Sequence, residues 1–269
     1  TVSGTANGDG NFSITVDASG LADGTLSLSI TATDAAGNVS AAGTSSAVKD
    51  IVAPTGYTID FDQAYANNAN EAGISFTFAG AEVGATYNYS INDADEAVTG
   101  TGTISRATDQ ITGINVSTLD DETLTITVTL TDPAGNAGVA DTDTLIKDTS
   151  APSVTNTYIV TTGNNGTSGE FKNGDTISVA WDNSAAGDNN TDVASVTVNF
   201  SEFGGGATVD ATSASDVWTA TYTLPADVNL TGKAVSVTAT DTAGNPTTTT
   251  DGDTYDVDTG KPTITLSSV

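Results

Sequence analysis

One six-residue motif, T-D-x-A-G-N, occurs three times and constrains the fold more than any other feature of the chain. Its copies span residues 33–38, 131–136 and 240–245. Each copy follows a run in which apolar residues alternate with small polar ones, which is the period of a β-strand with one buried face. Aspartate can close an Asx turn, and Gly or Asn accepts positive φ. Each copy is therefore predicted to be a strand end followed by a tight turn.

The spacing of the motif divides the chain into repeats of about 100 residues. We expect a partial repeat with later strands only over 1–50, complete repeats over 51–148 and 149–258, and the first strand of a further repeat over 259–269. Because the first and last pieces are incomplete, we expect the chain to be an internal segment of a longer protein.

Seven short strands are predicted in the second repeat, over 58–62, 74–78, 86–91, 98–104, 111–116, 122–131 and 142–146. The third repeat follows the same plan, over 154–160, 176–181, 193–200, 207–210, 218–224, 234–240 and 254–257. In the first repeat, residues 1–4, 12–16 and 26–32 match the later strands. Trp181 and Trp218 are in phase with apolar neighbours and are predicted to pack in a core. The predicted fold is all-β, with tandem immunoglobulin-like β-sandwich domains in an extended rod.

Composition excludes several classes of function. The chain of 269 residues has 34 acidic and 6 basic side chains, a formal net charge of -28, and neither cysteine nor histidine. Such a charge excludes nucleic acid as a partner, and the missing residues exclude Cys-His and Ser-His catalysis and thiolate zinc sites. No stretch is apolar enough to cross a membrane, so we expect no direct membrane insertion. Hard cations relieve such a charge, and aspartate, asparagine and backbone carbonyls are ligands that calcium takes.

Short linkers with a proline join the repeats, over 49–54, 147–152 and 256–262. Proline fixes its own φ and restrains the residue before it, so stiff joints are predicted. In a sandwich of this kind the turn between the last two strands lies at the pole of the incoming linker, as does the turn between the second and third strands. The aspartate of each motif is in phase with inward residues, so it should tip over that pole.

Carboxylates of two repeats are therefore expected to converge on each joint and to bind calcium. Ahead of the second repeat the candidate ligands are Asp50, Asp132, Asn136 and Glu82, facing Asp23. Ahead of the third repeat they are Asp148, Asp241, Asn245 and Asp182, facing Asp120, Asp121, Glu122 and Glu71. Asp34 and Asn38 of the first motif and Asp258 of the last linker complete the set. The alternative is that each aspartate only caps its own turn and that the charge is solvated surface.

Two further acidic pairs have a simpler interpretation. Asp141 and Asp143, like Asp256 and Asp258, are spaced by two on a final strand and share one face. A charged face protects an edge strand from pairing with another chain. Apart from Asp258, these residues are not predicted to bind a cation.

The combination of T-D-x-A-G-N with a D-x-x-A-P linker in tandem repeats resembles the bacterial Ig-like repeats of very large, calcium-dependent surface adhesins. Many of these are exported by type I secretion and carry calcium-stiffened extender regions. The resemblance covers the whole chain and implies a stalk at the bacterial cell surface, outside the cell, with calcium at the domain junctions and neighbouring repeats of the same chain as partners. Two features depart from it: the last linker has Thr-Gly-Lys-Pro, and the third repeat has longer acidic loops.

The leading hypothesis is a structural extender with no enzymatic activity. An alternative is a subunit of an extracellular filament or surface layer, in which other copies are the partners. A third hypothesis is a ligand-binding module that uses the loops 163–173 and 182–192. An enzyme is the least expected outcome, because the sequence groups no two acids in a recognisable cleft.

Overall fold

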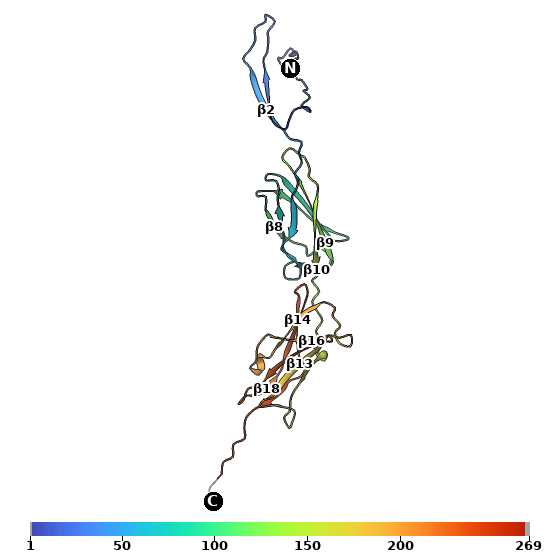
Figure 1. The fold of residues 1–269 in the computed structure, drawn as a ribbon, viewed down its shortest axis with the longest axis vertical. Coiled ribbons are helices and arrows are strands. Elements are labelled where there is room, and N and C mark those ends of the chain that lie inside the picture. The colour runs from blue at the N-terminus through green and yellow to red at the C-terminus, as the bar shows by residue number, and fades with distance from the viewer. Residues whose placement is uncertain (1, 267–269) are drawn as a thin grey trace.

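The structure is a computed structural model that describes residues 2–266, and its regular secondary structure is almost entirely β-strand. They form a hairpin over residues 24–49, a first sandwich over 58–147 and a second sandwich over 159–258. Figure 1 shows these parts one after another along the long axis, with the two chain ends at opposite extremes. The described chain has no helix that is long and apolar enough to cross a membrane. Its shape is that of an extended rod.

The hairpin pairs β1 (Gly24–Ile30) with β2 (Gly43–Lys49) in antiparallel register. The prediction of strands over 1–4 and 12–16 is wrong for residues 2–4 and 12–16. Residues 2–23 form no strand, and Phe12 and Val16 are exposed. A strand needs a neighbour to take its backbone N–H and C=O groups, and none of the described strands pairs with these residues, since β1 and β2 pair only with each other.

The first sandwich has eight strands, of which only the two-residue strand β4 was not predicted. They are β3 (Thr58–Phe61), β4 (Tyr65–Ala66), β5 (Ile74–Ala79), β6 (Thr86–Asn92), β7 (Ala97–Thr103), β8 (Gln110–Ile114), β9 (Thr123–Thr131) and β10 (Asp141–Lys147). Two sheets form, in the orders β3-β5-β8 and β4-β10-β9-β6-β7, and all pairs are antiparallel except β4 with β10. This is the arrangement of an immunoglobulin-like sandwich, as predicted.

Alternation along β9 builds the core of the first sandwich. Leu124, Ile126 and Val128 are fully buried, whereas Thr125 between them is exposed. The buried side chains belong to one cluster with Phe76 of the facing sheet. Burying each large apolar side chain stabilises the fold by roughly 1.5 to 3 kcal/mol.

The second sandwich follows the same plan with more and shorter strands. They are β11 (Ile159–Thr162), β12 (Phe171–Lys172), β13 (Thr176–Asp182), β14 (Val193–Asn199), β15 (Val209–Asp210), β16 (Thr212–Ala214), β17 (Val217–Thr223), β18 (Asn229–Lys233), β19 (Ser236–Asp241), β20 (Pro246–Thr250) and β21 (Tyr255–Asp258), with short 3-10 helices η1 (Asn156–Tyr158) and η2 (Ser201–Phe203). The sheets have the orders β11-β13-β17-β16, β15-β14-β19-β20 and β12-β21-β18. As predicted, Trp181 is buried in the core and Trp218 packs against it.

The final hairpin of the second sandwich is broken in two, which the sequence did not predict. In place of the continuous pair β9 and β10, β19 pairs with β20 in one sheet and β18 pairs with β21 in another. Between β20 and β21 the chain passes through the buried Asp251, whose carboxylate accepts hydrogen bonds from the hydroxyls of Thr161 (2.7 Å) and Tyr255 (3.1 Å). These bonds offset the desolvation of a buried charge.

Asp141 and Asp143 link the two sheets of the first sandwich, in place of forming a charged outer face. Their carboxylates accept hydrogen bonds from the backbone N–H groups of Ile59 and Phe61 on β3, each at 2.8 Å. The pair therefore covers the free edge of β3, the edge on which another strand could otherwise add.

The strand predicted to open a further repeat over 259–269 does not form in residues 259–266, where Ile264 and Leu266 are exposed. Residues 267–269 of this predicted strand lie outside the described residues.

Candidate metal centre

Each T-D-x-A-G-N turn is closed by its own aspartate, as the sequence predicted. Asp241 accepts hydrogen bonds from the backbone N–H of Asn245 at 2.7 Å and from the amide nitrogen of the Asn245 side chain at 2.8 Å. Asp132 makes the same two bonds to Asn136, at 2.8 and 2.7 Å. The side-chain amide of Asn136 holds the pKa of Asp132 below its usual value.

The exposed first copy of the motif has the same local geometry. Asp34 accepts from the backbone N–H of Asn38 at 2.9 Å and from its side-chain amide at 2.8 Å. The side-chain amide of Asn38 lowers the pKa of Asp34. Turn closure is therefore a property of the motif itself and does not depend on a neighbouring sandwich.

The asparagine of the motif also holds the incoming linker. The side-chain amide of Asn136 donates to the backbone carbonyl of Asp50 at 3.2 Å, and that of Asn245 donates to the carbonyl of Asp148 at 2.9 Å. We call this bond the linker clamp. It places the linker aspartate beside the aspartate of the motif at both joints.

Three carboxylates meet at the second joint. One oxygen each from Asp148, Asp192 and Asp241 lies within 4.8 Å of the others, and within residues 2–266 this is the only such group of three or more metal-ligating side chains. Asp148 belongs to the linker, Asp192 directly precedes β14, and Asp241 ends β19. Burial raises the pKa of Asp148, and the charges of Asp241, Asp192 and Asp121 raise it further. The group is thus a concentration of like charge that a cation would relieve.

Two of the three residues, Asp148 and Asp241, were predicted from the sequence, and Asp192 was not. Asp182, the predicted residue from the same loop, accepts from the backbone N–H of Ser184 at 2.8 Å and caps its own turn. The signal for Asp192 is strand pairing: β14 pairs with β19, and its first residue, Val193, lies opposite Asp241. Asp192, the last residue before β14, therefore lies beside Asp241.

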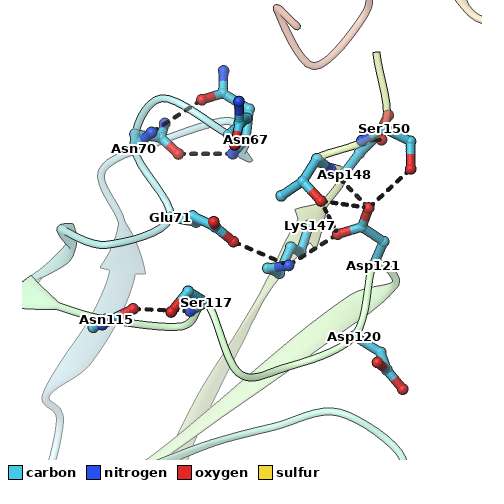
Figure 2. Close-up of polar contacts among 12 residues, drawn as sticks. Asn67, Asn70, Glu71, Asn115, Ser117, Asp120, Asp121, Lys147, Asp148 and Ser150 are labelled. Carbon is cyan, nitrogen blue, oxygen red and sulfur yellow. Dashed lines mark hydrogen bonds and ion pairs between the residues drawn. The ribbon is translucent and has the colours of Figure 1, made fainter. Parts of the chain in front are cut away.

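The carboxylates contributed by the first sandwich have a different partner from the predicted cation. Figure 2 shows the ammonium group of Lys147 between Asp121, at 2.9 Å, and Glu71, at 3.2 Å, while Asp120 points away from it. Burial raises the pKa of Asp121, but the Thr149 N–H and the Lys147 ammonium outweigh it, so the net pKa lies below the usual value. Lysine already neutralises these oxygens.

The same pairing occurs in the hairpin. Lys49 lies 2.8 Å from Asp23, which also accepts from the backbone N–H of Ile51 at 3.1 Å, and Lys49 lowers the pKa of Asp23. Asp23, predicted as a calcium ligand at the first joint, is thus paired with residues of the hairpin and its linker. Asp50 accepts from the backbone N–H of Val52 at 3.0 Å. The first joint keeps the linker clamp but, in the part of the chain that is described, gathers no group of three acids.

The remaining predicted ligands lie outside the three-carboxylate group. Asp258 accepts from the backbone N–H of Gly260 at 2.9 Å, and Glu122 accepts from that of Ala94 at 2.7 Å. Asp120 and Glu82 are exposed. Asp258 therefore caps its own turn, which is the alternative to calcium binding given above.

The two sandwiches also contact each other directly at the second joint. The side-chain amide of Asn67 donates to the carbonyl of Ala243 at 2.7 Å, and the backbone N–H of Asn68 donates to Oδ1 of Asn245 at 3.0 Å. Asn245 therefore bonds its own turn, the linker and the first sandwich together. The three-carboxylate group sits where these parts meet.

The residues present fit a hard divalent cation. The group offers carboxylate oxygens only, which suit calcium, magnesium or manganese, and no nitrogen or sulfur ligand that a softer metal prefers. Asp241 is 2 % exposed, and although the N–H groups of its own turn bond its carboxylate, no positively charged side chain pairs with it among the described residues. A bound cation would supply that counter-charge.

No protein-family model and no curated protein matches the chain. Solved structures do. A tetra-tandem repeat in the extending region of a large adhesion protein is 20% identical over 95% of this chain, with a TM-score of 0.35. A 1.5-MDa bacterial ice-binding adhesin is 21% identical over 95% of this chain and 82% of its own, with a TM-score of 0.44. Chicken CNTN1 domains FN1–FN3 are 12% identical over 83% of this chain and 76% of their own, with a TM-score of 0.43.

This chain spans 62% of the length of the first of these structures. Tandem repeats of adhesins, the class that the sequence motifs resemble, are thus among the solved structures similar to it. The assignment of the sandwich fold rests on the strand orders described above.

Proposed function

We propose that the chain is a structural segment of the stalk of an extracellular bacterial adhesin, with calcium at a sandwich junction stiffening the rod. The observation that carries the proposal is the convergence of Asp148, Asp192 and Asp241 at the joint that Asn245 clamps. The linker and the second sandwich each contribute carboxylates, so a cation bound there would tie the linker to the sandwich. The function lies in shape and stiffness, and the partners are neighbouring repeats of the same chain.

Calcium suits this arrangement better than magnesium. It accepts about 6 to 8 oxygens in irregular geometry, whereas magnesium requires a near-ideal octahedron and gives up its water reluctantly. A linker, a loop end and a strand end supply the oxygens here, so their directions are set by three separate backbone segments. Backbone carbonyls and water would complete the coordination.

The hypothesis that loop 182–192 binds a ligand loses support. Asn190 accepts from the backbone N–H of Ser153 and donates to the Ser153 carbonyl, both at 2.8 Å, and Asp188 accepts from the N–H of Thr155 at 2.7 Å. The loop is therefore bound to the start of its own sandwich. Its observed contacts serve the joint.

The proposal predicts that calcium stabilises the chain. An ion that binds only the folded, aligned state raises its stability by about 2.7 kcal/mol at one hundred times the dissociation constant. We expect a higher melting temperature in millimolar calcium than in chelator, and little effect of equal magnesium, measured by calorimetry at matched ionic strength. Superimposable curves in calcium and chelator would refute calcium binding.

A further inference from the structure

Asp121, a residue of the first sandwich, holds the linker next to the candidate cation site. Its carboxylate accepts hydrogen bonds from the backbone N–H of Thr149 at 2.8 Å, from the Thr149 hydroxyl at 2.9 Å and from the Ser150 hydroxyl at 3.2 Å. Figure 2 shows the bond from Ser150 to Asp121, with Lys147 on the other side of the same carboxylate. The residues that Asp121 holds directly follow Asp148, so they set where the Asp148 side chain starts.

The second sandwich holds the same linker from the opposite side. Asn245 donates to the Asp148 carbonyl at 2.9 Å, and Asn190 brackets Ser153 with two bonds. Asp148 therefore lies between a contact to the first sandwich and a contact to the second. Both contacts restrain the backbone segment from which the Asp148 carboxylate reaches Asp192 and Asp241.

We propose that Asp121 is a positioning residue for the cation site at the second joint: it binds no cation itself but fixes Asp148 so that the three carboxylates converge. The inference rests on the proposed function. It makes cation affinity depend on the first sandwich, although Asp192 and Asp241 belong to the second. By linkage, cation binding then holds the first sandwich in line by the same factor.

The test compares two neighbouring acids that differ in their contacts to the linker. Calcium is titrated calorimetrically into the full chain and into the variants Asp148→Asn, Asp121→Ala and Asp120→Ala. The calcium-binding step that Asp148→Asn abolishes is assigned to the three-carboxylate group. We expect Asp121→Ala to keep that event but weaken it by about 10-fold or more, as is common when a partner that orients a ligand is removed. Asp120→Ala, which removes the same charge without a side-chain bond to the linker, should weaken it far less.

High salt distinguishes the loss of a negative charge from the loss of the contact that positions Asp148. Loss of a long-range charge is screened at high ionic strength, whereas loss of a positioning contact is not, so the difference between the two alanine variants should persist at about 0.5 M salt. Thr149→Val leaves every charge in place and removes the contacts of the Thr149 hydroxyl with Asp121, so it should weaken binding in the same direction. This variant also decides the question if Asp121→Ala fails to fold.

Different results would overturn the cation site and the positioning role of Asp121. If the native chain and Asp148→Asn bind calcium identically, the proposed cation site is wrong. If Asp148→Asn loses the event while Asp121→Ala and Thr149→Val bind as tightly as Asp120→Ala, the site stands and the positioning role of Asp121 is overturned.

Discussion

Replacing Asp148 by asparagine is expected to stabilise the chain in chelator and to destabilise it in calcium. One oxygen of Asp148 lies within 4.8 Å of an oxygen of each of two other carboxylates. Without a cation, this is a repulsion of roughly 1 to 3 kcal/mol per pair. Because Asp148 is only half-buried, we expect a gain of about 1 kcal/mol in the free energy of unfolding. Asparagine retains the acceptor that the Ser150 N–H uses at 3.0 Å. In saturating calcium the variant instead loses the stabilisation by the ion.

The pH dependence of this effect has a definite sign. The pKa of Asp148 in the folded chain is raised above its ordinary value of 3.8, mainly by burial. Between 3.8 and the raised pKa, the folded chain binds a proton more readily than the unfolded chain does. The advantage of the asparagine variant in chelator is therefore complete at neutral pH and disappears as the pH falls through the raised pKa to below 3.8. Calorimetry of both chains over this range checks the sign.

Asp120→Asn is the matched control, because it removes one negative charge from the same joint outside the three-carboxylate group. It should change stability little, with or without calcium. A variant at Asp148 that lost stability under both conditions would show that the carboxylate has a structural role in place of a ligand role.

Replacing Lys147 by alanine is expected to destabilise the first sandwich by about 2 kcal/mol. The Lys147 side chain is 4% exposed, and those of its partners Glu71 and Asp121 are 20% and 29% exposed. Removing the lysine leaves two partly buried carboxylates without their counter-ion. Because both keep some contact with water, we place the effect below the 3 to 5 kcal/mol loss that is typical of fully buried pairs. Urea unfolding monitored by tyrosine fluorescence measures it.

The second sandwich suggests the control for this prediction. Val257 occupies the place that Lys147 has in the first sandwich, because each pairs with the buried residue of a two-residue parallel strand. After Val257, Thr259 donates to the carbonyl of Val228 from its backbone N–H at 3.0 Å and from its hydroxyl at 2.8 Å. An apolar residue is thus compatible with this place when no carboxylates face it. The triple variant Lys147→Val, Glu71→Gln and Asp121→Asn should therefore recover most of the stability. A single variant as stable as the native chain would contradict the role of the ion pair.

The sequence predicted the strands of the first sandwich well because each is short, alternating and bounded by turn residues. The continuous alternation from Leu124 to Leu130 fixes which face of β9 is buried, and the T-D-x-A-G-N turn ends it. The break between β20 and β21 was not predictable in the same way. It depends on Asp251 finding Thr161 and Tyr255, residues far apart in the chain, once the sandwich is formed.

The candidate site could be predicted in part. Asp148 and Asp241 follow from the recurrence of a motif with a linker, which is local information. Asp192 required knowledge that β14 pairs with β19. Asp121 was named as a candidate ligand, but its pairing with Lys147 could not be predicted from the sequence. A list of acids near one pole does not distinguish a carboxylate neutralised by lysine from one that faces other carboxylates.

Small-angle X-ray scattering of the full chain, with calcium and with chelator at matched ionic strength, tests whether calcium stiffens the rod. We expect an extended particle in calcium, and in chelator a shorter mean maximum dimension and a broader distance distribution. The variant Asp148→Asn should give a smaller difference between the two conditions than the native chain. Identical scattering of the native chain in calcium and in chelator, or a compact particle in calcium, would contradict a rod that calcium stiffens.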